Sequence, residues 1–171
     1  MDINVSKIKM TPGASAHFQL RETLNPAAYG YAEYQLTEPV SVSGSITNQG
    51  DGTFVLHGSY SAVAVLTCSR CGKDFSFTLS GEIDAMFAAE PAPDQEGEYS
   101  IFRLEQETAD LGEAVAGEIF FALPMQPLCR PDCKGLCPVC GTDLNQNSCS
   151  CQGGNIDPRW EKLKNFIIDE D

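Results

Sequence analysis

Eight cysteines are the residues of this chain whose type and spacing could do chemistry. They are Cys68, Cys71, Cys129, Cys133, Cys137, Cys140, Cys149 and Cys151. An even count is compatible with disulfides or with free thiols, but the cysteine density is well below that of a small disulfide scaffold. In a reducing compartment, closely spaced cysteine pairs are typical metal ligands. We therefore predict that these eight thiolates bind Zn²⁺, in one or two structural sites.

Two segments, 68–72 and 137–141, share the pattern Cys-x-x-Cys-Gly. Zinc takes four ligands in a tetrahedron, and two thiolates from one tight turn can supply half of them. The glycine after each pair permits the positive φ angle that closes such a turn. Both segments are therefore predicted to be zinc knuckles.

The ligand sets can be divided in two ways. In the first, Cys137, Cys140, Cys149 and Cys151 close one site locally, and Cys129 and Cys133 join the pair Cys68 and Cys71. In the second, the two Cys-x-x-Cys pairs face each other as the knuckles of a zinc ribbon. The spacing alone leaves both arrangements open.

Composition excludes several classes of protein. The 171 residues include 24 acidic and 11 basic side chains, giving a formal net charge of −13. This balance argues against broad electrostatic capture of nucleic acid. An apolar content of 42% argues against disorder. The sequence has neither an apolar run long enough for a membrane span nor a leader-like N-terminus, which predicts a cytoplasmic protein.

The basic residues are unevenly placed. Arg70, Lys73, Arg130 and Lys134, four of the eleven, lie beside cysteine pairs. A zinc ion with four thiolates carries a net charge of −2, so these cations are expected mainly to offset thiolate charge. Local contact of the four residues with RNA phosphates is the secondary hypothesis.

No motif of an enzyme is evident. A catalytic zinc keeps one coordination position open and commonly uses histidines, but the two histidines, His17 and His57, lie far from metal-ligand spacing. A hydrolase would need a non-cysteine ligand or a bound water at the metal. The sequence also lacks a phosphate-binding loop and a nucleophile elbow. We therefore predict that the protein is not an enzyme.

Alternation of apolar and polar residues predicts the strands that position the first knuckle. It runs through residues 40–46, 60–66 and 75–85, with a turn at 48–52 whose Asp-Gly step is typical of hairpins. Residues 60–85 should therefore form a long antiparallel hairpin with Cys68 and Cys71 at its tip. A further strand is expected at 99–104, after an exposed acidic loop at 89–99.

Two helices are predicted. Asp110 and Glu113 resemble a capping box before an apolar stripe from Leu111 to Ala122, and Pro124 should help to end this helix. A second helix is expected from Asp157 to about residue 167. The predicted fold is α+β, mainly an antiparallel sheet that can close as a barrel, with one packed helix. Residues 1–127 form the β-rich part, and residues 128–171 form a cysteine-rich segment that ends in a helix and packs on the first part.

Four stretches carry a resemblance to a known family. Residues 66–71, with Cys-Ser-Arg-Cys, the Leu-Pro step at 123–124, the cysteine-rich run 132–145 and Asp157-Pro-Arg-Trp160 resemble the YceD-like large ribosomal RNA subunit accumulation proteins of bacteria and plastids.

The resemblance implies a non-enzymatic role in ribosome biogenesis, supporting the accumulation or processing of large-subunit ribosomal RNA. Because the chain is acidic, the expected partner is a basic ribosomal protein or RNA-processing factor. The alternative function is a zinc-buffering or redox-responsive protein in which the thiols themselves act.

Overall fold

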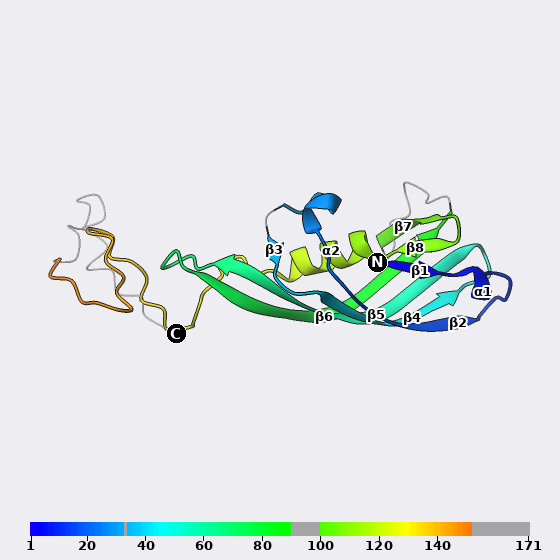
Figure 1. Cartoon of the computed structure of the whole chain (residues 1–171), viewed down its shortest axis with the longest axis horizontal. Coiled ribbons are helices and arrows are strands. Elements are labelled where there is room, and N and C mark those ends of the chain that lie inside the picture. Colours follow the sequence, from blue (N-terminus) through cyan, green and yellow to red (C-terminus); the bar gives the residue numbers. More distant parts are fainter. Residues whose placement is uncertain (33, 90–99, 152–171) are drawn as a thin grey trace, which may run out of the picture.

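The computed structural model describes residues 1–32, 34–89 and 100–151, and Figure 1 shows an elongated molecule that is mostly β-sheet. The described elements are, in chain order, β1 (Asp2–Asn4), α1 (Ser6–Lys9), β2 (Ser15–Glu22), the 3-10 helix η1 (Pro26–Tyr29), β3 (Gln35–Leu36), β4 (Val40–Asn48), β5 (Thr53–Thr67), β6 (Asp74–Ala88), β7 (Ser100–Glu105), β8 (Thr108–Asp110) and α2 (Gly112–Ala122). The predicted loop at 89–99, except Ala89, and the predicted C-terminal helix lie outside the described residues.

The eight strands form one barrel-like sheet that nearly closes. Its order is β1-β8-β7-β6-β5-β4-β2, and β3 pairs with β5. All strand pairs are antiparallel except β6 with β7, which run parallel. The two end strands approach each other where the Met1 amine lies 3.6 Å from a carboxylate oxygen of Glu22. The predicted sheet is thus confirmed, with one parallel pair added.

The longest element is the β5–β6 hairpin, which projects from the barrel toward the cysteine-rich end (Figure 1). Its fifteen-residue strands pair without interruption from Thr53 with Ala88 to Thr67 with Asp74. The alternation predicted for β6 is observed, because Leu79, Ile83 and Ala85 are buried while the residues between them are largely exposed. The hairpin therefore carries the first knuckle away from the barrel core.

Helix α2 packs on the sheet with Val115 and Ile119 fully buried. It begins at Gly112, after Leu111, and no side-chain cap is present, so the predicted capping box is wrong. The Asp110 carboxylate instead accepts hydrogen bonds from the Gly112 N–H (2.8 Å) and the Tyr29 hydroxyl (3.1 Å). Gly112 fits because a Cβ there would overlap Tyr29, so the close approach requires glycine.

Leu123 is extended (ψ 135°), as expected before Pro124, and the helix ends there. Ala122, predicted to face the sheet, is exposed. Beyond the helix, residues 128–151, which we call the cysteine segment, lie at the tip of the hairpin (Figure 1). Among the described residues, no helix is long and apolar enough to cross a membrane.

Candidate metal centre

The eight cysteines gather into two groups of four. Cluster A comprises Cys68 and Cys71 from the hairpin tip with Cys129 and Cys133, and cluster B comprises Cys137, Cys140, Cys149 and Cys151. Within each cluster all sulfur atoms lie within 4.8 Å of one another. The structure therefore builds the first of the two predicted arrangements. The zinc-ribbon arrangement is not observed, because the two Cys-x-x-Cys pairs belong to different clusters.

The sulfur spacing in cluster A fits a tetrahedral metal site. The Sγ atoms of Cys68 and Cys133 are 3.8 Å apart, as are those of Cys71 and Cys129. A zinc–sulfur bond of about 2.3 Å gives a tetrahedral edge of about 3.8 Å. A disulfide needs about 2.05 Å, and all eight cysteines are free. Each cluster could thus hold one metal ion.

The two knuckles share one backbone conformation. In the first, the Cys68 N–H donates to the Lys73 carbonyl and the Gly72 N–H donates to the Cys68 carbonyl, both at 2.9 Å. In the second, the Cys137 N–H donates to the Thr142 carbonyl and the Gly141 N–H to the Cys137 carbonyl, at 2.8 and 2.9 Å. The φ angles of Gly72 and Gly141 are 67° and 73°. This left-handed conformation is the reason that both turns need glycine.

Backbone N–H groups around each knuckle favour thiolate over thiol. Hydrogen bonds from the backbone of Cys129, and then of Cys71 and Arg70, lower the pKa of Cys68 to about 6. The Thr142 hydroxyl, 3.1 Å from the Cys140 sulfur, lowers the pKa of Cys140 to about 6. Each cluster therefore contains a cysteine whose pKa lies below neutral pH, Cys68 in cluster A and Cys140 in cluster B.

One other cysteine of each cluster, Cys129 in cluster A and Cys151 in cluster B, has a strongly raised pKa. Burial, and then the neighbouring Cys68, raises the pKa of Cys129 to about 12. Hydrogen bonding with Cys140, and then burial, raises the pKa of Cys151 to about 12. Metal uptake by either cluster would therefore release protons.

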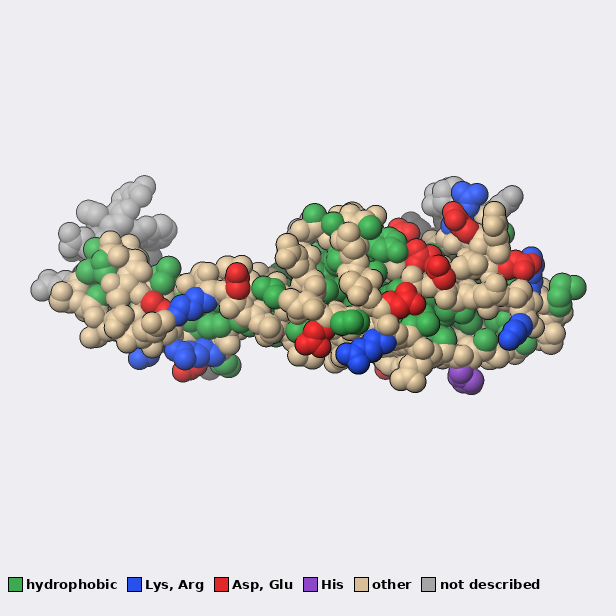
Figure 2. All heavy atoms as spheres, in the orientation of Figure 1, with side chains coloured by type: hydrophobic (Ala, Val, Ile, Leu, Met, Phe, Trp, Pro, Cys, Tyr) green, Lys and Arg blue, Asp and Glu red, His purple; other side chains and the backbone are tan. Residues whose placement is uncertain are grey.

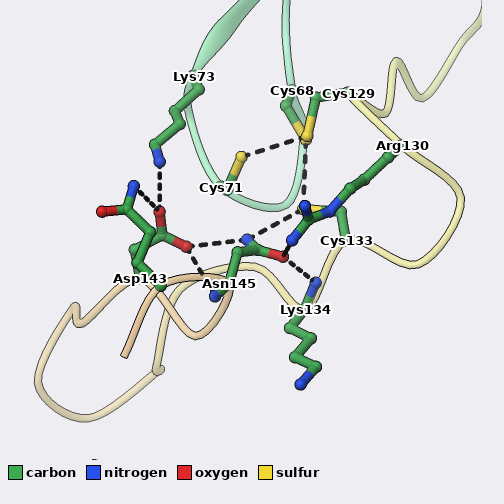
Figure 3. Close-up of polar contacts among 10 residues, drawn as sticks. Cys68, Cys71, Lys73, Cys129, Arg130, Cys133, Lys134, Asp143 and Asn145 are labelled. Atoms are coloured by element: carbon green, nitrogen blue, oxygen red, sulfur yellow. Dashed lines mark hydrogen bonds and ion pairs between the residues drawn. The ribbon is translucent and has the colours of Figure 1, made fainter. Parts of the chain in front are cut away.

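Asn145 joins the two halves of the site (Figure 3). Its side-chain oxygen accepts from the Lys134 N–H at 2.8 Å and the Arg130 guanidinium at 2.7 Å. Its side-chain nitrogen donates to Asp143 at 2.8 Å and to the Cys133 sulfur at 3.4 Å. Asn145 lies between Cys140 and Cys149 in sequence, so the loop of cluster B supports a ligand of cluster A. Its role was missed because Asp-x-Asn is typical of an ordinary loop.

The basic residues have specific partners. Arg70 donates to the Cys133 carbonyl at 2.8 Å, and Lys73 forms an ion pair of 2.5 Å with Asp143. That ion pair holds the pKa of Asp143 at about 2. Arg130 contacts Asp132 as well as Asn145. Arg70 and Lys73 therefore bind the hairpin tip to the cysteine segment, whereas Arg130 makes its contacts within that segment. Charge compensation alone did not predict the role of Arg70 and Lys73.

The charges divide the molecule into two regions (Figure 2). The hairpin tip, residues 66–75, and the cysteine segment together carry four basic and three acidic side chains. The other described residues carry eleven acidic and four basic side chains. The barrel is therefore the acidic part of the described structure.

The two histidines are not part of either cluster. His17 is exposed on β2. His57 lies on β5 with Nδ1 2.6 Å from an Asp84 carboxylate oxygen of β6. Among the described residues, neither histidine joins a cysteine cluster, so neither cluster gains the mixed ligands that are typical of a catalytic zinc.

Comparison with known proteins places this architecture in a family. The family model described as "Large ribosomal RNA subunit accumulation protein YceD" matches residues 56–167, which include all eight cysteines. An uncharacterized protein of Mycobacterium tuberculosis is 30% identical over 98% of this chain and 81% of its own length. No solved structure matches the chain.

Two plant relatives have informative names. The chloroplastic large ribosomal RNA subunit accumulation protein YCED homolog 1 of Zea mays is 27% identical over 69% of this chain and 50% of its own length. Its counterpart in Arabidopsis thaliana is 23% identical over 65% of this chain and 43% of its own length. The chain belongs to the YceD family of large ribosomal RNA subunit accumulation proteins.

Proposed function

We propose that this protein is a non-catalytic accessory factor that supports the accumulation of large-subunit ribosomal RNA. The family match, which spans the hairpin from Leu56 onward, α2 and both cysteine clusters, is the observation that carries the proposal. The names of the two plant relatives point to the same role. The wide acidic barrel offers a binding surface, while no described cluster has the mixed ligands of a catalytic metal.

In this proposal, clusters A and B each bind a structural Zn²⁺. Sets of four thiolates in a tetrahedron are typical of structural zinc, and they leave no position open for a substrate. The thiolates that would bind these ions already accept hydrogen bonds from N–H groups. Such bonds orient metal ligands, as expected at a site that stabilises the fold. Metal analysis of protein purified without chelators should give two zinc ions per chain.

The partner in this proposal is a basic ribosomal protein or RNA-processing factor that contacts the acidic barrel. Electrostatic complementarity with a protein of opposite charge raises its association rate. RNA contact through the hairpin tip and the cysteine segment is a second candidate, favoured by the four cations there, all of which are exposed. Neutralising Arg70, Lys73, Arg130 and Lys134 would abolish salt-dependent RNA binding if the second candidate holds.

A second candidate function is a thiol-based zinc buffer or redox sensor. Cys140 of cluster B is exposed and has a lowered pKa, two conditions for a reactive thiol. Rapid zinc release on mild oxidation would support this function. Zinc that stays bound under the same treatment would support the structural role.

Depletion of the protein tests the ribosomal function. The ratio of precursor to mature large-subunit RNA should rise on depletion and return to normal with the wild-type chain. Cys71→Ser should fail to restore the ratio, whereas Ser69→Ala, in the same exposed turn, should restore it. An unchanged ratio after depletion would overturn the proposed function.

A further inference from the structure

The β6 strand has a long edge without a partner in the described part of the chain. All of β6 pairs with β5, but β7 covers the other side only from Ala85 to Ala88. Residues 74–84 therefore have no strand on that side, and no other described segment donates to or accepts from their backbone there. The edge has no proline and no bulge, two features that usually protect such strands.

The register shows which backbone groups are available at this edge. The Cys68 N–H donates to the Lys73 carbonyl, so this pair and every second pair after it are hydrogen-bonded within the hairpin. Along β6 the alternate residues then direct their N–H and C=O groups away from β5. They are the even-numbered residues from Asp74 to Asp84. An added strand would find several donors and acceptors at its usual spacing.

The surroundings of this edge are acidic. Across β6 and the adjacent helix α2 there are five carboxylates and no basic residue. The carboxylates are those of Asp74, Glu82, Asp84, Glu113 and Glu118. Burial, and then the charge of Asp84, raises the pKa of Glu118. Excess negative charge near this edge is consistent with that shift.

A cavity of about 180 Å³ lies where the open edge meets β7 and α2. Its wall includes the carboxyl-bearing residues Asp84, Glu113 and Glu118 and the rings of Phe102 and Phe121. Phe121 is 79% exposed, so its ring is accessible to a ligand. Carboxylates combined with aromatic rings suit an arginine or lysine side chain, through ion pairs and cation–π contact.

We propose that the open edge of β6 binds an extended segment of a basic protein by β-strand addition, with one arginine or lysine side chain in the adjacent cavity. This inference rests on the proposed function, because it names the surface that the basic partner would use. Of the two end strands of the sheet, β2 carries His17, Arg21 and Glu22, so its charges are mixed and not uniformly acidic.

A synthetic peptide of sequence Val-Arg-Val-Lys-Val-Arg-Val, added to the full zinc-loaded chain, tests the inference. Binding is measured by fluorescence anisotropy, and its place by amide hydrogen exchange. We expect slower exchange at Ser76, Thr78, Ser80 and Glu82, because their N–H groups would gain partners. The same peptide with glutamate in place of the basic residues should not bind.

Thr78→Pro removes one outward N–H and leaves the β5–β6 ladder complete, so it should weaken binding of the basic peptide about tenfold. Thr78→Ala keeps the N–H and should bind as the wild type does. If Thr78→Pro fails to fold, the double variant Asp84→Asn with Glu118→Gln gives the same test through charge, and the expected loss is again about tenfold.

Four results would overturn the inference: no binding at millimolar peptide, equal binding of the acidic peptide, protection on β2 in place of β6, or unchanged affinity in the test variants. None of these results measures ribosomal RNA. If the ratio of precursor to mature RNA rises on depletion but the peptide test fails, this surface is rejected and the proposed function stands.

Discussion

Replacement of Asn145 should lower the metal affinity of cluster A. The Asn145 side chain donates to the Cys133 sulfur at 3.4 Å and fixes the Cys133 region by accepting from the Lys134 N–H. In Asn145→Ala both contacts are lost. In Asn145→Asp the oxygen contacts can remain, but a carboxylate replaces the donor beside a thiolate, so repulsion is added.

The size of the effect follows from these contacts. A hydrogen bond to a charged group contributes about 1.5–3 kcal/mol, and residues that orient metal ligands typically change affinity by about 10–100-fold. The Asn145 side chain is only half-buried. We therefore expect a loss of about tenfold for Asn145→Ala and a larger loss for Asn145→Asp.

The assay is competition for Zn²⁺ with a chromophoric chelator, followed until both ions have been removed. Asn147→Ala is the matched control, because this exposed residue lies in the same loop and donates its backbone N–H to the Asp143 carbonyl, a bond that alanine keeps. We expect the control to match the wild type. Equal zinc affinity of Asn145→Ala and the control would refute the reasoning.

Three further predictions concern stability. Removal of zinc by a chelator should increase amide exchange in the hairpin tip and the cysteine segment and leave the barrel amides protected, since the main core cluster contains no cysteine. Gly112→Ala should lower the free energy of unfolding by about 1–2 kcal/mol through overlap with Tyr29, whereas Gly117→Ala, which meets only a movable hydroxyl, should be nearly neutral in chemical denaturation. Glu118→Gln should raise the thermal midpoint at about pH 8 and lose this advantage as the pH falls, because protonation of Glu118, whose pKa is raised, favours the folded chain.

The hairpin and α2 could be predicted because their signals are local. Alternation in β6 reflects one buried face, and the apolar residues of α2 reflect a helix that is buried on most of its sides. The short elements β1 and α1 are not apparent in the sequence, since three or four residues establish no period. Asn48 holds α1 in place by donating to the carbonyls of Ile8 and Lys9, a contact between segments distant in sequence.

The candidate site was predictable in part for the same reason. Each Cys-x-x-Cys-Gly turn is a local motif, so both knuckles could be recognised from spacing. The division of the cysteine pairs between the two clusters depends on the path of the chain from α2 to the hairpin tip. There the Ser69 N–H donates to the Pro127 carbonyl. That contact brings Cys129 and Cys133 to cluster A. Asn145 and the Lys73–Asp143 ion pair depend on the same non-local docking.

The different spans of the two clusters imply an order of metal capture. Cys68 and Cys133 are separated by 65 positions, which include β6, β7, β8 and α2, whereas cluster B lies wholly within residues 137–151. Loop-closure entropy therefore costs about 1.4 kcal/mol more for cluster A. An unfolded full-length chain could fill cluster B from a few neighbouring residues. An occupied cluster A, by contrast, would report that the whole of the intervening fold has assembled.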